Sequence, residues 1–330
     1  MSIRIIKAGI SDSIQDLGRY GYQHWGINPT GAMDKFSTKL ANILVGNEPT
    51  EAVLEMHFPA SVFLFEKPAL IALAGGDFLA SINGETIPLL QAILVNKNTI
   101  LQFNQFQNGA RVYLAVKDGF EINDWLNSCS THLKAGVGGF NGRSLRKDDQ
   151  LFFKSENLFS SLLAEKEFIV LPWKADAKWN ENEREELLVL PGYEWQYLTE
   201  ESQKNFVKKP FGITNQSDRM GYRLNGPSLK VLSNEELVSS AVNFGTLQLL
   251  PDGQLILLMA DHQTTGGYPR IAHVITAHHS KAAQMRSGDK IFFRFTDQRT
   301  AEYLFVKQEQ HLLQLKSACQ FKLQSYFNER

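Results

Sequence analysis

The sequence predicts a mainly β protein, with two β-domains in tandem, a few helices and a helical C-terminal tail. Three observations lead to this prediction: the apolar runs are short, two dipeptides are typical of hairpin turns, and a pattern of residues recurs late in the chain. The length of 330 residues also exceeds the ~250–300 at which a single hydrophobic core stops growing. Two cores are therefore expected.

The strands are predicted from short apolar runs that are bounded by Gly, Pro, Asn or Asp. Many of these runs are rich in β-branched or aromatic residues, which is typical of strands. Asn83-Gly84 and Asp252-Gly253 have the composition of tight hairpin turns, so that antiparallel pairing is favoured. The predicted strands include residues 61–65, 70–74, 100–103, 111–116, 151–153, 247–250 and 291–295.

Two segments have the apolar spacing of helices. Asp34 is a suitable N-cap, and apolar residues recur at helical intervals from Phe36 to Leu44 before Gly46-Asn47 ends the pattern. In the tail from about Thr300, a second stripe of residues recurs at spacings of three or four, which predicts a terminal helix with one buried face. Its members are Leu312, Leu315, Cys319, Leu323 and Tyr326.

An internal repeat divides the chain. Residues 145–154 (LRKDDQLFFK) resemble residues 285–294 (MRSGDKIFFR), and residues 19–22 (RYGY) resemble residues 219–222 (RMGY) in the same order. Two matches in one order favour a divergent duplication. The stretch between the copies ends in a charged run, which suits a linker. We predict a first domain at 1–155, a linker at 156–185, a second domain at 186–298 and a helical tail at 299–330.

Composition excludes several classes of protein. The formal net charge is −1 with scattered Lys and Arg, so that no surface for nucleic acid or an anionic membrane is expected. No apolar run approaches the ~20 residues that span a bilayer. Charged residues near the N-terminus exclude the apolar core of a signal peptide. Cys129 and Cys319 have neither metal spacing nor a disulfide framework. These features favour a cytoplasmic protein.

Three polar, glycine-containing segments stand out from the strand background: residues 13–34, 215–222 and 259–269. The third follows an apolar run, so that a buried strand delivers Asp261, His262 and Gln263 to its end. Neighbouring strand residues face opposite ways, and Asp261 and His262 therefore form an acid/base pair only if the chain bends. Thr264 to Gly267 offer hydroxyl and N–H groups to an anionic oxygen. A β-turn that satisfies its own polar groups is an equally good interpretation.

Arginines and histidines in these segments also have two interpretations. Arg19 and Arg219 can each clamp a carboxylate or phosphate, but a bridge to a loop carboxylate such as Asp16 or Asp218 is favoured. His278-His279 lacks a third ligand at metal spacing, so that we expect a solvated turn and no metal site.

The polar segments resemble the KipA / allophanate hydrolase subunit 2 family, also called the biotin-dependent carboxyltransferase family. The similarity runs from about residue 3 to residue 296. Its motifs are IQDLGR at 14–19, GYQ at 21–23, GAMD at 31–34, LAN and LVGN within 40–47, SDRMGY at 217–222 and DHQTTGGYP at 261–269.

This resemblance implies tandem cyclophilin-like β-barrels, in agreement with the repeat. Free-standing bacterial members are usually the C subunit of 5-oxoprolinase, which opens 5-oxoproline to L-glutamate with hydrolysis of ATP. The resemblance thus implies two partners, a KipI-like B subunit and a LamB/YcsF-like A subunit, with ATP used in the complex. A chain that completes its site with a partner is expected to be inactive alone.

Two other roles remain open: a KipA-like regulator that binds a KipI-like kinase inhibitor, and a carboxyltransferase component that uses a biotin carrier in trans. The sequence has no Met-Lys-Met biotinylation site, so that no covalently bound biotin is expected. If the chain is part of an enzyme, we assign proton transfer to Asp261 and His262. The residues assigned to substrate or phosphate binding are Arg19, Tyr22, Asp34, Asp218, Arg219, Gln263, Thr264, Thr265, Gly266, Gly267 and Tyr268.

Overall fold

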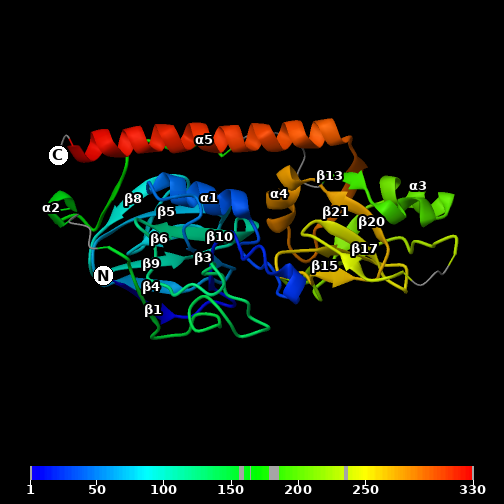
Figure 1. Cartoon of the computed structure of the whole chain (residues 1–330). Helices are drawn as coiled ribbons and strands as arrows, with labels where there is room; N and C mark the ends of the chain where they lie inside the picture. Colours follow the sequence, from blue (N-terminus) through cyan, green and yellow to red (C-terminus); the bar gives the residue numbers. More distant parts are fainter. Residues whose placement is uncertain (1, 156–159, 164, 178–185, 234–236, 329–330) are drawn as a thin grey trace. The chain divides into compact units, whose positions relative to one another are not determined.

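The computed structural model describes residues 2–155, 160–163, 165–177, 186–233 and 237–328 (Figure 1). Regular structure in these ranges is mainly β, which confirms the predicted fold class. Contacts divide the chain into two compact units. Unit 1 comprises Met1–Gly18, Asp34–Trp179 and Glu309–Arg330, and unit 2 comprises Arg19–Met33 and Asn180–Gln308. Much of the predicted linker at 156–185 lies outside the described residues, and the predicted domain bounds stay a prediction.

Unit 1 contains two antiparallel six-stranded sheets, with strand orders β11-β1-β4-β9-β6-β7 and β12-β8-β5-β10-β3-β2. Both sheets contribute to one core, for example Phe63 and Phe65 from the first sheet and Ile71 and Leu73 from the second. The strands are β1 (Ser2–Lys7), β2 (Ser13–Gln15), β3 (Val53–Met56), β4 (Val62–Phe65), β5 (Ala69–Asp77), β6 (Ala80–Ile82), β7 (Glu85–Thr86), β8 (Ala92–Val95), β9 (Thr99–Phe103), β10 (Asn108–Val116), β11 (Gln150–Phe152) and β12 (Phe168–Val170).

Local signals in unit 1 behave as predicted. Asn83 and Gly84 join β6 to β7 with φ values of 48° and 90°, the left-handed pair that a two-residue type I′ hairpin requires. Helix α1 (Lys35–Leu44) begins at Asp34, whose Oδ1 accepts the Ser37 N–H at 2.9 Å and whose Oδ2 accepts the Ser37 hydroxyl at 2.6 Å. Gly46 follows the helix with φ of 73°.

Unit 2 is built on a closed barrel with the strand order β13-β20-β17-β18-β15-β14-β21. Helix α3 (Glu200–Lys208) packs on it, because Phe206 stacks on Phe293 of β21 with ring centroids 5.0 Å apart (Figure 1). Met33 also belongs to the barrel core. The barrel strands are β13 (Glu186–Pro191), β14 (Phe211–Ile213), β15 (Gly221–Asn225), β17 (Thr246–Leu249), β18 (Leu255–Leu258), β20 (Arg270–Val274) and β21 (Lys290–Phe295).

Smaller elements complete the two units. A two-stranded ribbon pairs β16 (Ser240–Ala241) with β19 (Thr265–Gly266) in unit 2. The remaining elements are the 3-10 helices η1 (Gln23–Trp25), η2 (Tyr193–Tyr197) and η3 (Thr276–His278), and the α-helices α2 (Ser160–Leu163), α4 (His279–Ala283) and α5 (Gln298–Asn328).

One marker of the predicted repeat has the same structure in both units. The Arg146 N–H donates to Asp149 Oδ2 at 2.7 Å, and the Arg286 N–H donates to Asp289 Oδ2 at 2.9 Å. In each case the aspartate carbonyl then accepts a hydrogen bond at 2.9 Å from an isoleucine of strand β1 or β14. The same turn thus leads into the closing strands β11 and β21. The second marker differs, since residues 19–22 lie in no strand whereas β15 begins at Gly221.

The tail forms helix α5, and its predicted stripe is the buried one. Leu312, Cys319 and Leu323 are buried, and Tyr326 packs edge-on against Trp173 with centroids 5.9 Å apart. Within the described ranges, no helix has the length and apolar character needed to cross a membrane.

The expectation of a solvated His278 is wrong. His278 is 2% exposed, and its Nδ1 accepts the Leu188 N–H at 3.0 Å, which ties η3 to strand β13. Burial, and then the nearby charges of Lys281 and Arg294, lower the pKa of His278 to about 4. The imidazole is therefore neutral in the folded chain at neutral pH.

This buried histidine predicts an acid-sensitive contribution to stability. Between pH 4 and 6.5 the unfolded chain binds a proton that the folded chain does not, so that stability falls as pH falls through this window, by on the order of 3 kcal/mol in total. His278→Gln keeps an acceptor for the Leu188 N–H but does not titrate. Denaturant unfolding from pH 4 to 7 should show a weaker acid loss in the variant; parallel curves for both proteins would contradict this.

Candidate functional site

Strand pairing brings the second and third polar segments together in unit 2. Strands β15 and β18 are antiparallel neighbours in which Gly221 pairs with Leu258. The chain just before β15 therefore lies beside the chain just after β18. The backbone ladder continues there, since the Asp261 N–H donates to the Arg219 carbonyl at 2.8 Å. Arg219 and Asp261 are consequently neighbours where the ladder between β15 and β18 continues past the strand ends.

Their side chains form a buried, two-pronged ion pair. Arg219 Nε lies 3.1 Å from Asp261 Oδ2, and Arg219 Nη2 lies 3.1 Å from Asp261 Oδ1. Arg219 is 9% exposed and Asp261 is 4% exposed. Arg219 thus bridges to a carboxylate, as favoured from the sequence, and this carboxylate belongs to Asp261. The planar guanidinium fits a carboxylate in this geometry.

The first polar segment contributes to the same cluster, because Arg19–Met33 belongs to unit 2 although its sequence neighbours on both sides belong to unit 1. Arg219 Nη2 donates to the Gly31 carbonyl at 2.5 Å. Asn28 Nδ2 donates to the carbonyls of Asp261 at 2.8 Å and His262 at 2.7 Å. All three polar segments therefore meet through hydrogen bonds.

His262 has a defined tautomer in this cluster. Its Nδ1 lies 2.6 Å from the Gln263 carbonyl oxygen, and a carbonyl can only accept, so that Nδ1 carries the hydrogen. A neutral His262 then has its lone pair on Nε2. The Asp261 carboxylate is engaged by Arg219 instead of Nδ1. The assignment of proton transfer to Asp261 and His262 stays a prediction.

Several assigned binding residues have structural contacts. Both carboxylate oxygens of Asp34 cap helix α1 in unit 1, as described above. Asp218 Oδ1 accepts the N–H groups of Met220 at 2.7 Å and Gly221 at 3.3 Å, which shapes the turn before β15. Arg19 is 1% exposed, and Tyr22 packs near Trp25 with ring centroids 5.8 Å apart.

The third segment continues as strand β19. Gly266 pairs with Ser240 of β16, and the Thr264 carbonyl accepts the Val242 N–H at 3.2 Å. This backbone is extended and paired with a neighbour, and the assignment of Thr264 to Gly267 to an anionic oxygen stays a prediction. Gln263, Thr265, Gly266, Gly267 and Tyr268 instead border a pocket.

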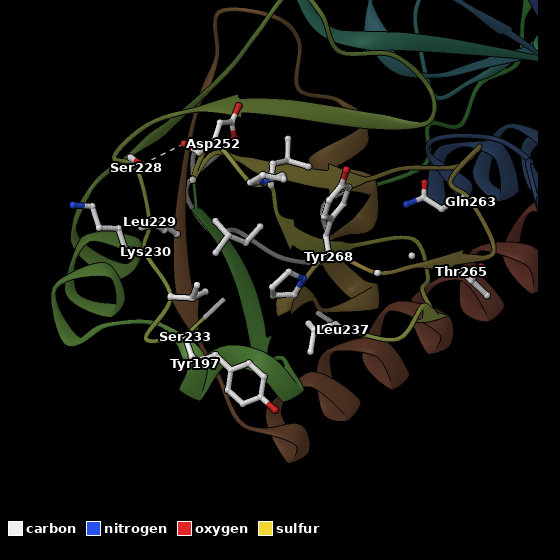
Figure 2. Close-up of a pocket in the computed structure, with 18 residues that line it drawn as sticks. Tyr197, Ser228, Leu229, Lys230, Ser233, Leu237, Asp252, Gln263, Thr265 and Tyr268 are labelled. Atoms are coloured by element: carbon white, nitrogen blue, oxygen red, sulfur yellow. Dashed lines mark hydrogen bonds between the residues drawn. The ribbon is translucent and has the colours of Figure 1, made fainter. Parts of the chain in front are cut away.

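That pocket has a volume of about 1220 Å³ and lies within unit 2 (Figure 2). Figure 2 shows Tyr268 in the middle of the lining residues, and Tyr268 is 46% exposed. The volume exceeds the ~300–1,000 Å³ that is usual for small-molecule sites, which leaves room for a sizeable ligand. The remaining lining residues are Tyr197, Ser228, Leu229, Lys230, Val231, Ser233, Leu237, Leu249, Leu250, Pro251, Asp252, Gly253 and Pro269.

Sequence reasoning missed Gln248 on β17. This residue is fully buried, and its Oε1 accepts a hydrogen bond from Gln263 Nε2 at 3.1 Å. The alternation of side chains along a strand could have identified this residue. Leu247 and Leu249 flank it in a predicted strand, and both belong to the barrel core. A polar residue at such a position faces away from the core.

Two other kinds of site, a metal centre and a reactive cysteine, have less support. In the described part of the chain, no three His, Cys, Asp or Glu side chains gather as a metal would require. Burial raises the pKa of Cys129 and of Cys319 to about 11 each, so that both thiols are protonated at neutral pH and are poor nucleophiles.

The ion pair predicts a large, coupled effect on stability. Asp261→Ala removes one partner of a buried, two-pronged ion pair with Arg219 and should lower the free energy of unfolding by about 3–5 kcal/mol. The double variant Arg219→Met/Asp261→Leu removes both charges and should cost much less than the sum of the single changes. Urea unfolding of the chain measures both effects, and additive losses would show that the pair is not coupled.

Comparisons with known proteins agree with this fold. Residues 25–295 match the family model "Carboxyltransferase domain, subdomain A and B". The 5-oxoprolinase C subunit of Haemophilus influenzae is 34% identical over 95% of this chain and 97% of its own length. The 5-oxoprolinase C subunit of Escherichia coli is 35% identical over 88% of this chain and 90% of its own length.

Solved structures extend the comparison. The urea amidolyase of K. lactis superposes with a TM-score of 0.87 at 27% identity over 95% of this chain, which spans 20% of that protein. Because the family model covers most of the chain and both 5-oxoprolinase relatives match over nearly their whole length, this protein belongs to the carboxyltransferase-domain family with subdomains A and B.

Proposed function

We propose that this chain is the C subunit of an ATP-dependent 5-oxoprolinase that opens 5-oxoproline to L-glutamate. The observation that carries the proposal is the similarity of 34% and 35% identity to two proteins named as the C subunit of 5-oxoprolinase, over 97% and 90% of their lengths. A cytoplasmic location accompanies this proposal.

The chemistry of the cluster supports a role in opening an amide bond. Hydrolysis of a lactam requires proton transfer to or from water and the ring nitrogen. His262 offers a lone pair on Nε2 because its Nδ1–H is directed at the Gln263 carbonyl. Arg219 and Asn28 hold this segment in place through Asp261. We therefore assign proton transfer to His262 and a positioning role to Asp261.

Partners follow from the proposed function. The relatives named as components of 5-oxoprolinase imply a heteromeric complex, and we propose a KipI-like B subunit and a LamB/YcsF-like A subunit for it. We propose that the complex uses ATP, and the comparisons assign ATP binding to no particular chain. This sequence lacks the Gly-rich loop and Lys-Ser/Thr of a phosphate-binding P-loop. No covalently bound biotin is proposed for this chain.

A second candidate is a carboxyltransferase component served by a biotin carrier in trans. The similarity to the K. lactis urea amidolyase favours it, with a TM-score of 0.87. The K. lactis urea carboxylase superposes almost as well, with a TM-score of 0.86 at 27% identity. Both proteins are much longer than this chain, which covers 20% and 29% of them.

Reconstitution tests the proposed function. The chain should be purified with the KipI-like and LamB/YcsF-like proteins, and glutamate formation from 5-oxoproline and ATP measured with each protein omitted in turn. We expect turnover by the complete complex and none by the chain alone, because a shared site is incomplete without its partner. Robust turnover by the chain alone would contradict shared catalysis, and binding of the KipI-like protein without any turnover would favour the regulator.

The assignment of His262 has its own test. His262→Asn keeps an N–H donor for the Gln263 carbonyl but removes Nε2, so that activity of the complex should fall about 10²–10⁴-fold with little change in stability. His311→Ala, at a histidine that contacts the Asp176 carbonyl in unit 1, is the control and should leave activity unchanged. If His262→Asn retains activity within a few fold, His262 is structural.

A further inference from the structure

The large pocket of unit 2 has no role in the proton transfer assigned to His262. Its volume of about 1220 Å³ is far more than one molecule of 5-oxoproline fills. ATP, the other small molecule of the proposed reaction, has more than three times as many heavy atoms. The pocket therefore suits a larger ligand, and the residues that line it indicate the chemistry of that ligand.

Tyr268 offers an aromatic face to such a ligand. Its side chain lies in the middle of the lining residues and is 46% exposed (Figure 2). Gly266 and Gly267, which precede it along the chain and also line the pocket, have no side chain that could cover the ring. Nucleic-acid bases stack on exposed aromatic side chains of this kind.

Gln263 supplies a hydrogen-bond acceptor of fixed orientation. Its Nε2 donates to Gln248 Oε1 at 3.1 Å, so that Gln263 Oε1 is the atom left for a ligand. This oxygen has no partner among the residues that the structure describes, and it is not one of their buried unpaired atoms, so that it is accessible on a residue that lines the pocket. It suits the N6 amino group of adenine and disfavours guanine, which has a carbonyl oxygen at the equivalent position.

Polar groups of opposite charge lie on the other side of the ring. Figure 2 shows Gln263 on one side of Tyr268 and, on the other, Asp252 followed by Lys230. Asp252 Oδ1 accepts the Gln254 N–H at 2.9 Å, and no described residue engages Oδ2, which suits ribose hydroxyls. Lys230 is exposed, and its ammonium makes no ion pair with any described residue, which suits a phosphate. This is the order of base, ribose and phosphate in a nucleotide.

We propose that this pocket binds an adenine nucleotide. Tyr268 stacks on the base, Gln263 Oε1 accepts from the N6 amino group, and Lys230 pairs with a phosphate. Such a site recognises the base and therefore needs no P-loop. The proposed function gives the nucleotide a role, because the complex uses ATP, but the inference concerns binding by this chain alone.

Ligand-observed NMR on the purified chain tests the site. Saturation transfer to the adenine protons of ATP is expected, with weaker transfer to GTP, whose carbonyl oxygen faces Gln263 Oε1. Tyr268→Ala should weaken ATP binding roughly 5- to 100-fold through the loss of stacking. Tyr193→Ala is the matched control and should leave binding unchanged, since Tyr193 is 73% exposed in the same unit but is not among the residues that line the pocket.

Gln263→Met tests the recognition of the base. Methionine preserves length but has no carbonyl acceptor, so that ATP binding should weaken roughly 3- to 10-fold, the effect of one lost hydrogen bond. The preference for ATP over GTP should disappear with it. The thermal midpoint is measured in parallel, because the bond to Gln248 is lost as well. A variant that keeps the full preference for ATP, whatever its midpoint, would contradict the role of Gln263.

Lys230→Met separates the charge from the base. It should weaken the binding of ATP and leave that of adenosine, which has no phosphate, unchanged. No transfer to ATP in the wild-type chain, or transfer that is equal in Tyr268→Ala, Gln263→Met and Lys230→Met, would overturn the inference. ATP binding with the expected dependences, in a chain whose complete complex fails to open 5-oxoproline, would support the inference and contradict the proposed function.

Discussion

The ion pair between Arg219 and Asp261 is the interaction on which the candidate site depends. It joins Arg219, two residues before β15, to Asp261, three residues after β18, and Arg219 also holds the Gly31 carbonyl at 2.5 Å. Buried ion pairs often add little net stability, because desolvation offsets the attraction between the charges. Their geometry is nevertheless demanding, and a two-pronged contact fixes both orientation and distance. The pair is therefore best understood as a device that positions three segments, including the one that carries His262.

The contact of Arg219 with the Asp261 carboxylate accounts for the tautomer of the neighbouring His262. With its carboxylate engaged, Asp261 leaves the Nδ1–H of His262 to the Gln263 carbonyl, which places the lone pair of a neutral imidazole on Nε2. Gln263 lines the pocket and in turn donates to the buried amide of Gln248 on β17. A short run of residues thus links the buried charge pair to the pocket wall.

Local signals predicted much of the fold, whereas contacts distant in sequence did not follow from them. The Asn83-Gly84 hairpin, the Asp34 cap and the buried stripe of α5 are each decided by neighbouring residues, and each is confirmed. The partner of Arg219 depends on the register of β15 against β18, which no single segment encodes. The membership of residues 19–33 in unit 2 is likewise a property of tertiary contacts. His278 looked like a solvated turn residue because adjacent histidines give no sign of burial.

The central claim is that the Arg219–Asp261 pair holds the three polar segments together, and amide hydrogen exchange tests it most directly. The informative amides are those of Arg19, which donates to the Pro29 carbonyl at 2.7 Å, and Asp261, which donates to the Arg219 carbonyl at 2.8 Å. In Asp261→Asn, we predict that residues 19–33 and 259–263 lose protection together while the ladder of β17 and β18 keeps its protection. Loss of protection at 259–263 alone, with residues 19–33 as protected as in the wild-type chain, would contradict the account.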